Sequence, residues 1–275
     1  MGEVIFFNQL TLSSYQYLIF DLRSETEFQK CHISGTHNAP LEAIDEEFTI
    51  AFFDKFLKRY TLKLFQLKKT PFIGIVGQGE EASELELKLV DKFKEGGFKN
   101  VELLIDGIKI FSKKYPVFLS NYQPLTNTKI ATMYFPNIIE KDFFLLGNYR
   151  SAKNLDVMKS LGVKRIVNAA LQCENVFEND KRIDVKYYNC YWDDLSSQDI
   201  AKDLVKVLDW IDSEKSLVFV HCQMGISRSA SIAIAWVMKH YNIDYDSAFK
   251  VVKNARLCVS PNMGFKEQLK NLDLN

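Results

Sequence analysis

The chain has 275 residues, 47% of them hydrophobic and 25% charged, which is typical of a globular protein with one large domain or two smaller ones. Lys and Arg together number 35, as do Asp and Glu, so no net charge attracts the chain to nucleic acid or to a membrane surface. The amino terminus lacks a basic region, and no window has the roughly 18 apolar residues of a membrane span, so we expect neither a signal peptide nor membrane insertion.

The cysteines are odd in number and scattered, without the paired spacing of zinc sites or of a disulfide framework. This pattern favours a reducing compartment, and we expect the cytoplasm or the nucleus. The five are Cys31, Cys173, Cys190, Cys222 and Cys258.

The first 120 residues predict a parallel α/β domain. Short apolar runs at 17–23, 71–77 and 101–107 predict strands, and residues 80–97 have helical spacing and end in two glycines. A strand, a helix and a strand in this order predict a parallel βαβ unit. The polar segment 120–129, which contains a proline, is the best candidate for a linker.

A second alternation of strands and helices follows the linker and predicts a second α/β domain. Strands are expected at 143–147, 163–170, 184–192 and 216–220, and helices at 151–162, 197–215, 230–241 and 244–256. The predicted organisation is therefore a first domain at 1–120, a linker at 121–129 and a second domain at 130–275.

The segment VHCQMGISRS, residues 220–229, joins a predicted buried strand to a predicted helix. The N–H groups of such a loop converge on an anion, and the helix dipole adds positive potential. Gly225 permits a tight turn, and Arg228 can bind two phosphate oxygens at once. Such surroundings can lower the pKa of a thiol from about 8.5 to roughly 3.5–7.5, so Cys222 is predicted to be a thiolate nucleophile for phosphoryl transfer.

The other residues of this segment have supporting roles in the prediction. The hydroxyl of Ser229 can hydrogen-bond to the sulfur and help it leave, and His221 orients the loop rather than acting as a base. The remaining phosphate-binding positions are Gln223, Met224, Gly225, Ile226 and Ser227. A buried structural cysteine near a surface arginine is the alternative, and the added His, Gly and Ser argue against it.

A general acid for the leaving oxygen is expected in the loop after the strand at 184–192. Asp193 and Asp194 both lie there, and a carboxylic acid at this place can protonate the leaving group and then activate water. The spacing alone does not choose between the two, and a solvated or helix-capping acidic pair is the alternative.

Residues 130–273 resemble the dual-specificity protein phosphatases. HCQMGISRS matches their HCxxGxSRS signature, FFLLGNYRSAKN and LGVKRIVNAA resemble the opening of the domain, and SPNMGFKEQL resembles its closing helix. The resemblance implies Asp194 as the general acid, Cys222 as the nucleophile, Arg228 as the phosphate-binding arginine and Ser229 as the residue that assists departure of the sulfur. It also implies that Asn262 supports the loop.

The first half resembles a rhodanese domain, through LIFDLRSETEFQKCHISGTHNAP and DGIKIFSKKYP. The loop in which a rhodanese has its sulfur-bearing cysteine is IVGQGEEASE here, without a cysteine, so we expect no sulfur transfer. A silent rhodanese-like domain before a dual-specificity phosphatase is the organisation of the MAP kinase phosphatases. Their pseudophosphatase relatives, the STYX-type proteins, have lost the nucleophile, which is present in this chain.

In the MAP kinase phosphatases the rhodanese-like domain binds the kinase through basic residues followed by apolar ones. The nearest match is Lys58 and Arg59 followed by Leu62 and Leu64, which suits an acidic docking groove. An amphipathic surface helix with solvated lysines is the alternative interpretation of the same segment.

The expected activity is hydrolysis of phosphotyrosine and phosphothreonine or phosphoserine on a protein, most simply a kinase, through a phosphocysteine intermediate. We expect no metal, no other cofactor, no nucleic acid and no membrane as partners. Two alternatives remain: a scaffold that binds a phosphoprotein with little or no turnover, and the same chemistry on RNA 5′ ends or phosphoinositides. The uncharged residues 223–227 speak against the second alternative, and the complete set of Cys, Arg, Ser and Asp speaks against the first.

Overall fold

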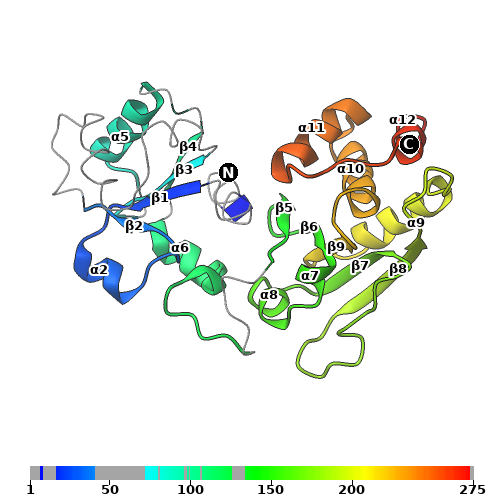
Figure 1. Ribbon diagram of the computed structural model, residues 1–275, viewed down its shortest axis with the longest axis horizontal. Helices are drawn as coiled ribbons and strands as arrows, with labels where there is room; N and C mark the ends of the chain where they lie inside the picture. Colours follow the sequence, from blue (N-terminus) through cyan, green and yellow to red (C-terminus); the bar gives the residue numbers. More distant parts are fainter. Residues whose placement is uncertain are drawn as a thin grey trace. The chain divides into compact units, whose positions relative to one another are not determined.

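The computed structural model describes residues 7–8, 17–40, 72–79, 81–95, 98, 100–105, 107–125 and 134–272 (Figure 1). The chain divides into two compact units, Met1–Gln123 and Pro124–Asn275. The domain limits at 120 and 130 stay a prediction. No helix of the described part is long and apolar enough to cross a membrane.

A parallel sheet in the order β2-β1-β3-β4 forms the centre of the first unit. Every residue of β3 is buried, because α5 and α6 lie on opposite sides of the sheet (Figure 1). The strands are β1 (Tyr17–Asp21), β2 (His37–Asn38), β3 (Phe72–Val76) and β4 (Val101–Leu104), and the helices are α2 (Glu25–Lys30), α5 (Glu84–Glu95), α6 (Gly107–Lys114) and the 3₁₀ helix η2 (Pro116–Phe118).

The second unit contains a five-stranded sheet in the order β5-β6-β9-β7-β8, in which β5 is antiparallel to β6 and the other pairs are parallel. The strands are β5 (Asn137–Glu140), β6 (Phe144–Asn148), β7 (Arg165–Ala170), β8 (Lys186–Trp192) and β9 (Val218–Cys222). The helices are α7 (Tyr149–Ala152), α8 (Leu155–Ser160), α9 (Ala201–Asp212), α10 (Arg228–Tyr241), α11 (Tyr245–Ala255) and α12 (Met263–Lys270). The expected α/β class is confirmed for both halves of the chain.

The central strand β9 and the helix α10 that follows it are the most buried elements of the second unit. All five residues of β9 and the first eleven residues of α10 are buried, in keeping with the apolar runs that predicted them. The sheet therefore holds the carboxyl end of β9 rigidly between β6 and β7, and α10 starts from that end.

The prediction of a single helix at 151–162 is wrong, because the segment contributes to two short helices, α7 and α8. The carboxamide of Asn148 accepts a hydrogen bond from the N–H of Ser151 at 2.9 Å, and that of Asn154 accepts one from Val157 at 3.1 Å. Each asparagine caps the start of its own helix, so the helical conformation is interrupted at residues 153–154.

The sequence did not predict strand β5, and it predicted a later start for α10. β5 is a short edge strand whose pairing with β6 is interrupted by a bulge between Ile138 and Glu140, so it has little alternating pattern. The helix expected at 230–241 begins at Arg228, which brings the arginine and Ser229 onto its first turn.

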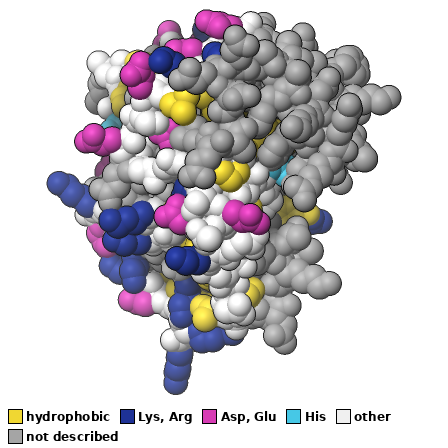
Figure 2. Space-filling view, turned by 90° about the vertical axis from the view of Figure 1, so that its left-hand side faces the viewer, with side chains coloured by type: hydrophobic (Ala, Val, Ile, Leu, Met, Phe, Trp, Pro, Cys, Tyr) yellow, Lys and Arg dark blue, Asp and Glu magenta, His cyan; other side chains and the backbone are white. Residues whose placement is uncertain are grey.

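Both acidic and basic side chains occur together on the face shown in Figure 2, which agrees with the balanced total of 35 residues of each sign.

Candidate active site

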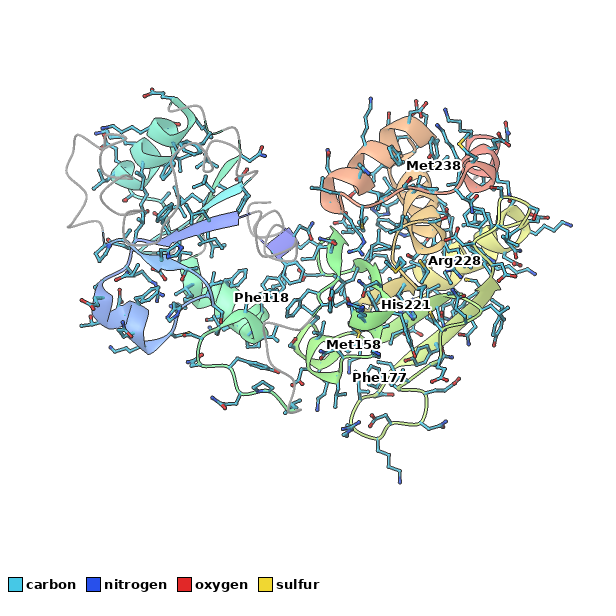
Figure 3. All side chains as sticks on the ribbon, viewed as in Figure 1. Phe118, Met158, Phe177, His221, Arg228 and Met238 are labelled. Atoms are coloured by element: carbon cyan, nitrogen blue, oxygen red, sulfur yellow. The ribbon has the colours of Figure 1, made fainter. Side chains whose placement is uncertain are left out.

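Five residues, 223–227, connect the last residue of β9, Cys222, to the first residue of α10, Arg228. Figure 3 labels His221 on the strand and Arg228 on the helix. The Cys222 side chain is 1% exposed and that of Arg228 is 4% exposed, so both belong to the core as well as to the loop. The strand end and the helix start therefore hold the two residues in fixed positions around the loop.

The sulfur of Cys222 accepts two hydrogen bonds. The backbone N–H of Gly225 and the hydroxyl of Ser229 each donate to Sγ at 3.2 Å. The sequence predicts that Ser229 lies beside the sulfur, and in the structure its hydroxyl contacts the sulfur directly. Both donors point at the one atom that the loop surrounds, which is the arrangement needed for a sulfur that carries negative charge during a reaction.

Gly225 is required at its position for two reasons. Its φ is +70°, in the region that favours glycine, and a Cβ there would lie 2.5 Å from the carbonyl oxygen of Gly147 on β6. Any side chain at this position would push the loop away from the sheet.

The guanidinium of Arg228 is partly satisfied by the protein and partly free. Nη1 donates to the side-chain oxygen of Gln172 at 2.7 Å and to the carbonyl of Trp192 at 3.0 Å. Nε is buried without a hydrogen-bond partner in the described structure, at 3.6 Å from Oδ2 of Asp194. An unsatisfied buried N–H costs free energy, so this N–H is suited to donate a hydrogen bond to a bound anion.

Asp194 and Asp193 differ clearly in their surroundings. Oδ1 of Asp194 accepts a 2.6 Å bond from the Ser227 hydroxyl and a 3.0 Å bond from the Asn262 carboxamide. Oδ2 has no hydrogen bond within the described part of the chain, only the 3.6 Å contact with Arg228. Asp193 is exposed, and its N–H binds Gln198 rather than any residue of the loop at 223–227. The structure therefore brings Asp194, and not Asp193, to the arginine.

Asn262 connects three parts of the site. Its backbone N–H binds the Ser227 hydroxyl at 3.1 Å, its carboxamide nitrogen donates to Asp194, and its carboxamide oxygen caps α12 by accepting from the N–H of Phe265 at 3.0 Å. The expected role of Asn262, to support the loop, stays a prediction, and these three contacts are the observations that support it.

Arg256 was missed from the sequence, although it contacts the loop directly. Its guanidinium donates to the carbonyls of Met224 and Gly225 and to the side chain of Asn137 on β5, at 2.8–3.1 Å. By binding the carbonyls of Met224 and Gly225, it holds the loop in the conformation in which the N–H of Gly225 donates to Cys222. Burial lowers the pKa of Arg256, yet at neutral pH a guanidinium keeps its charge.

Helix α12 also holds the loop that contains Asp194, through residues of the closing segment 260–269 to which the sequence assigned no role. The side chain of Gln268 accepts bonds from the N–H groups of Ile200 and Ala201 and donates to the carbonyl of Gln198 at 2.8 Å. Gly264 lies so close to this loop that a Cβ would be 1.9 Å from the carbonyl oxygen of Ser196.

We predict that Gly264→Ala lowers kcat/KM about 100-fold, because the loop must move to admit the methyl group and a shift of about 1 Å in a reacting group has an effect of that size. Alanine favours helix formation more than glycine does, so α12 itself gains rather than loses stability. Steady-state kinetics on an aryl phosphate would measure the change. The exposed Glu267→Ala on the same helix is the control, and a Gly264→Ala rate within twofold of wild type would contradict the prediction.

His221 is buried between aromatic rings and is uncharged at neutral pH. Its ring lies 5.6 Å from that of Phe219 and 6.2 Å from that of Tyr149, and Nδ1 has no hydrogen-bond partner in the described structure. Burial lowers the pKa of His221 to about 4. Orientation of the strand end therefore fits this residue better than acid or base chemistry.

The depressed pKa of His221 has a consequence for stability. Above pH 6.5 both folded and unfolded chains hold a neutral ring, but between pH 6.5 and 4 only the unfolded chain takes up the proton, so stability falls with falling pH. We expect a loss of about 2 kcal/mol between pH 7.5 and pH 5 from this residue alone. All three tryptophans lie in the second unit, so urea unfolding followed by their fluorescence reports on it. His221→Gln should lose about 2 kcal/mol less than wild type, and equal losses would contradict the prediction.

Cys173 lies close enough to the site to interact with it. Its thiol donates to the side-chain oxygen of Gln223 at 3.2 Å, and burial together with the neighbouring Cys222 raises its pKa to about 11. Cys173 is therefore a neutral thiol at pH 7 and not a second nucleophile. Among the described residues, no group of three or more His, Cys, Asp or Glu is placed to hold a metal ion.

The loop after β3 in the first unit is filled by the protein's own carboxylate. Glu86, 1% exposed, accepts hydrogen bonds from the N–H of Gln78 at 2.7 Å and from that of Ser83 at 2.8 Å. A Cβ on Gly77 would lie 2.9 Å from the same carboxylate. Cys31, the one cysteine of the first 123 residues, is on another segment and donates to Asn121. The expected lack of sulfur transfer by this loop stays a prediction.

The residues expected for docking, Lys58, Arg59, Leu62 and Leu64, lie outside the described residues, so their arrangement stays a prediction.

The other residues of the loop at 223–227 divide between exposed and buried positions: the side chains of Gln223 and Met224 are exposed, whereas Ser227 is buried. The carbonyl of Ile226 accepts the N–H of Ser260, which ties the loop to the segment before α12.

Comparison with protein families gives a match for each half of the chain. Residues 144–273 match the family described as the dual specificity phosphatase catalytic domain, and residues 9–114 match the rhodanese-like domain.

Individual proteins that match this chain are named dual specificity protein phosphatases. Dual specificity protein phosphatase 1-A of Xenopus laevis is 26% identical over 290 residues, covering 93% of this chain and 78% of that protein. A probable rhodanese domain-containing dual specificity protein phosphatase of Dictyostelium discoideum is 34% identical over 140 residues, which are 50% of this chain and 29% of that protein. Human dual specificity protein phosphatase 1 is 37% identical over 130 residues, 46% of this chain and 34% of the human protein. The last two alignments thus span about a third of those relatives.

Among solved structures, the Yvh1 phosphatase domain of Chaetomium thermophilum matches with 27% identity and a TM-score of 0.46, covering 50% of this chain and 93% of that domain.

Proposed function

Because the chain carries a rhodanese-like domain followed by a dual specificity phosphatase catalytic domain, we propose that its second unit hydrolyses phosphate monoesters of proteins through a phosphocysteine on Cys222. The observation that carries the proposal is that the loop at 223–227 has this sulfur, bonded to the N–H of Gly225, at its start and the buried, unsatisfied Nε of Arg228 at its end. The sulfur supplies the nucleophile, and the guanidinium N–H supplies a partner for a phosphate oxygen.

In the first step, Sγ of Cys222 attacks phosphorus, so that the S–P bond forms and the bond to the leaving oxygen breaks. N–H groups of residues 223–228 and the guanidinium of Arg228 hold the remaining phosphate oxygens as charge moves onto them. Asp194 donates its proton to the leaving oxygen through Oδ2, the oxygen without a hydrogen bond in the described structure.

In the second step, Asp194 takes a proton from water, and the water oxygen attacks phosphorus as the S–P bond breaks. The sulfur leaves with the bonding electrons and regains its two hydrogen bonds, from the N–H of Gly225 and the hydroxyl of Ser229. Inorganic phosphate then dissociates, and the thiolate of Cys222 and the protonated Asp194 are both restored without any other reactant.

The substrate is a protein that carries phosphotyrosine or phosphothreonine/serine, and a phosphorylated kinase is the finer proposal. What supports a protein over RNA 5′ ends or phosphoinositides is the absence of Lys and Arg from residues 223–227, since a substrate with several phosphates needs more cations than Arg228. The scaffold alternative leaves the contacts of Cys222, Ser229 and Asp194 without a purpose.

The test uses the full chain and four substrates: an aryl phosphate, a phosphotyrosine peptide, a phosphoinositide in micelles and an RNA with a 5′ triphosphate. We expect vanadate-sensitive release of phosphate from the first two. No vanadate-sensitive release from any substrate would favour the scaffold, and a higher kcat/KM on the lipid or the RNA would overturn the protein substrate.

For the kinase proposal, charge reversal at Lys58 and Arg59 should weaken capture of the kinase in a pull-down, and unchanged capture would reject docking by these residues.

A further inference from the structure

Large apolar side chains are exposed on the segments that surround the phosphate-binding loop. We call the four most exposed of them the apolar rim: Leu171, Leu195, Met224 and Met263, which are 56–63% exposed, compared with 42% for Val176 and 48% for Leu257. Exposed single apolar residues are ordinary on a protein surface, but four on the borders of one site indicate a binding surface.

Two members of the rim are tied to the arginine and the acid. The N–H of Leu171 donates to the carbonyl of Trp192, the same carbonyl that accepts a bond from Arg228. Leu195 follows Asp194 directly in the loop that carries the acid.

The other two members are tied to the loop itself and to its support. Met224 is part of the phosphate-binding loop, and its carbonyl accepts a bond from Arg256. Met263 follows Asn262, whose side chain donates to Asp194. The rim therefore comes from four separate segments that meet at the sulfur and the arginine.

The charges of these segments complement the rim. Residues 171–176, 193–199, 223–227 and 257–263 contain no Lys or Arg, whereas they contain Glu174, Asp193, Asp194 and Asp199. The two arginines next to them, Arg228 and Arg256, are buried and bonded to Trp192 and to the loop carbonyls. A substrate that approaches the site thus meets apolar side chains and negative charge, and no exposed cation from these four segments.

We propose that the apolar rim selects phosphoprotein segments with large apolar side chains next to the phosphorylated residue and discriminates against segments with acidic neighbours. The apolar neighbours gain by leaving water against the rim, and acidic neighbours are repelled by the carboxylates while finding no basic partner in these four segments. This inference rests on the proposed phosphatase function and adds the chemistry of the recognised segment.

The test compares three phosphotyrosine peptides that differ at the two positions flanking the phosphotyrosine, which are Leu, Gln or Glu. With the full chain, kcat/KM should fall in that order, with the Leu peptide about tenfold better than the Gln peptide, which is the size of effect that modest apolar contacts give. The variant Leu171→Ser/Met263→Ser should reduce this ratio to about two or less. Val205→Ser on α9 and Val251→Ser on α11 replace apolar residues outside the four segments that are 45% and 42% exposed, and they should retain the wild-type ratio.

Equal or better hydrolysis of the Glu peptide by the wild type would overturn the inference, as would an unchanged ratio in the rim variant. Hydrolysis of an aryl phosphate by the same preparation separates the two levels of the account. If the aryl phosphate is hydrolysed and the peptides are not discriminated, the phosphatase function stands and the rim proposal fails. If the aryl phosphate is not hydrolysed either, the proposed function fails, and the rim proposal with it.

Discussion

Cys222→Ser is expected to lower kcat for an aryl phosphate by at least about 10⁴-fold, because the loop at 223–227 contains no other thiol. A serine hydroxyl holds its proton at neutral pH and has no base beside it, since the neighbouring His221 is buried in an aromatic cluster. Continuous measurement of phenolate release by wild type and variant gives the ratio.

The control for this prediction is Cys31→Ser, which removes a thiol from the first unit and leaves the site at Cys222 untouched. Circular dichroism and the tryptophan signal should show that Cys222→Ser retains the fold, because Ser occupies a similar volume and can accept the bonds from Gly225 and Ser229. A Cys222→Ser variant with more than about a tenth of the wild-type rate would show that the hydrolysis uses another group.

Asp194→Asn is expected to lower kcat by about 10²–10³-fold on a phosphoserine peptide, whose alkoxide leaving group needs a proton. The loss should be much smaller on an aryl phosphate with an acidic phenol, since that leaving group departs without help. Asn preserves the acceptor oxygen that Ser227 and Asn262 bind, so the loop should keep its place. Comparison of kcat on the two substrates separates loss of the acid from a shift of the loop.

Asp193→Asn is the matched control for the acid, with the same change in charge one residue away. Its side chain is exposed and, among the described residues, forms no ion pair with Arg228, so kcat should stay within about twofold of wild type on both substrates. A large loss in Asp193→Asn with a small one in Asp194→Asn would reverse the assignment.

The part of the site that is continuous in sequence could be predicted, because the strand, the loop and the helix start are local. The spacing of Cys222 and Arg228 implied a loop around an anion, and the structure has Gly225 and Ser229 as donors to the sulfur. The choice between Asp193 and Asp194 could not come from spacing. It depends on Asn262, which is 68 residues from Asp194 along the chain.

The supports of the site could not be predicted from single residues. Arg256 reaches loop carbonyls 31 and 32 residues earlier and a side chain on β5, a strand too short and too irregular to give a pattern. Gly264 lies in an ordinary helical segment, and its close approach to Ser196 depends on tertiary packing alone. The break between α7 and α8 was present in the sequence as two capping asparagines, Asn148 and Asn154, but helical spacing of the apolar residues masked it.

The first unit shows the same division between local and long-range information. The order of strands and helices predicted a parallel sheet, and the sheet β2-β1-β3-β4 confirms it. The absence of a cysteine from the loop after β3 was visible in the sequence. That Glu86 fills this loop with its carboxylate follows from its place in the first turn of α5, where Ser83 and Glu86 bind each other's N–H groups.

The most direct test of the account is to trap the covalent intermediate. Asp194→Asn should slow attack by water as well as leaving-group protonation, so an aryl phosphate with an acidic phenol should load the enzyme faster than the enzyme is cleared. After acid quenching and digestion, mass spectrometry should find one phosphoryl group on the peptide that contains Cys222, and none in Asp194→Asn/Cys222→Ser. A phosphoryl group on His221 or on another residue, or none at all while phenol is released in a burst, would contradict a phosphocysteine on Cys222.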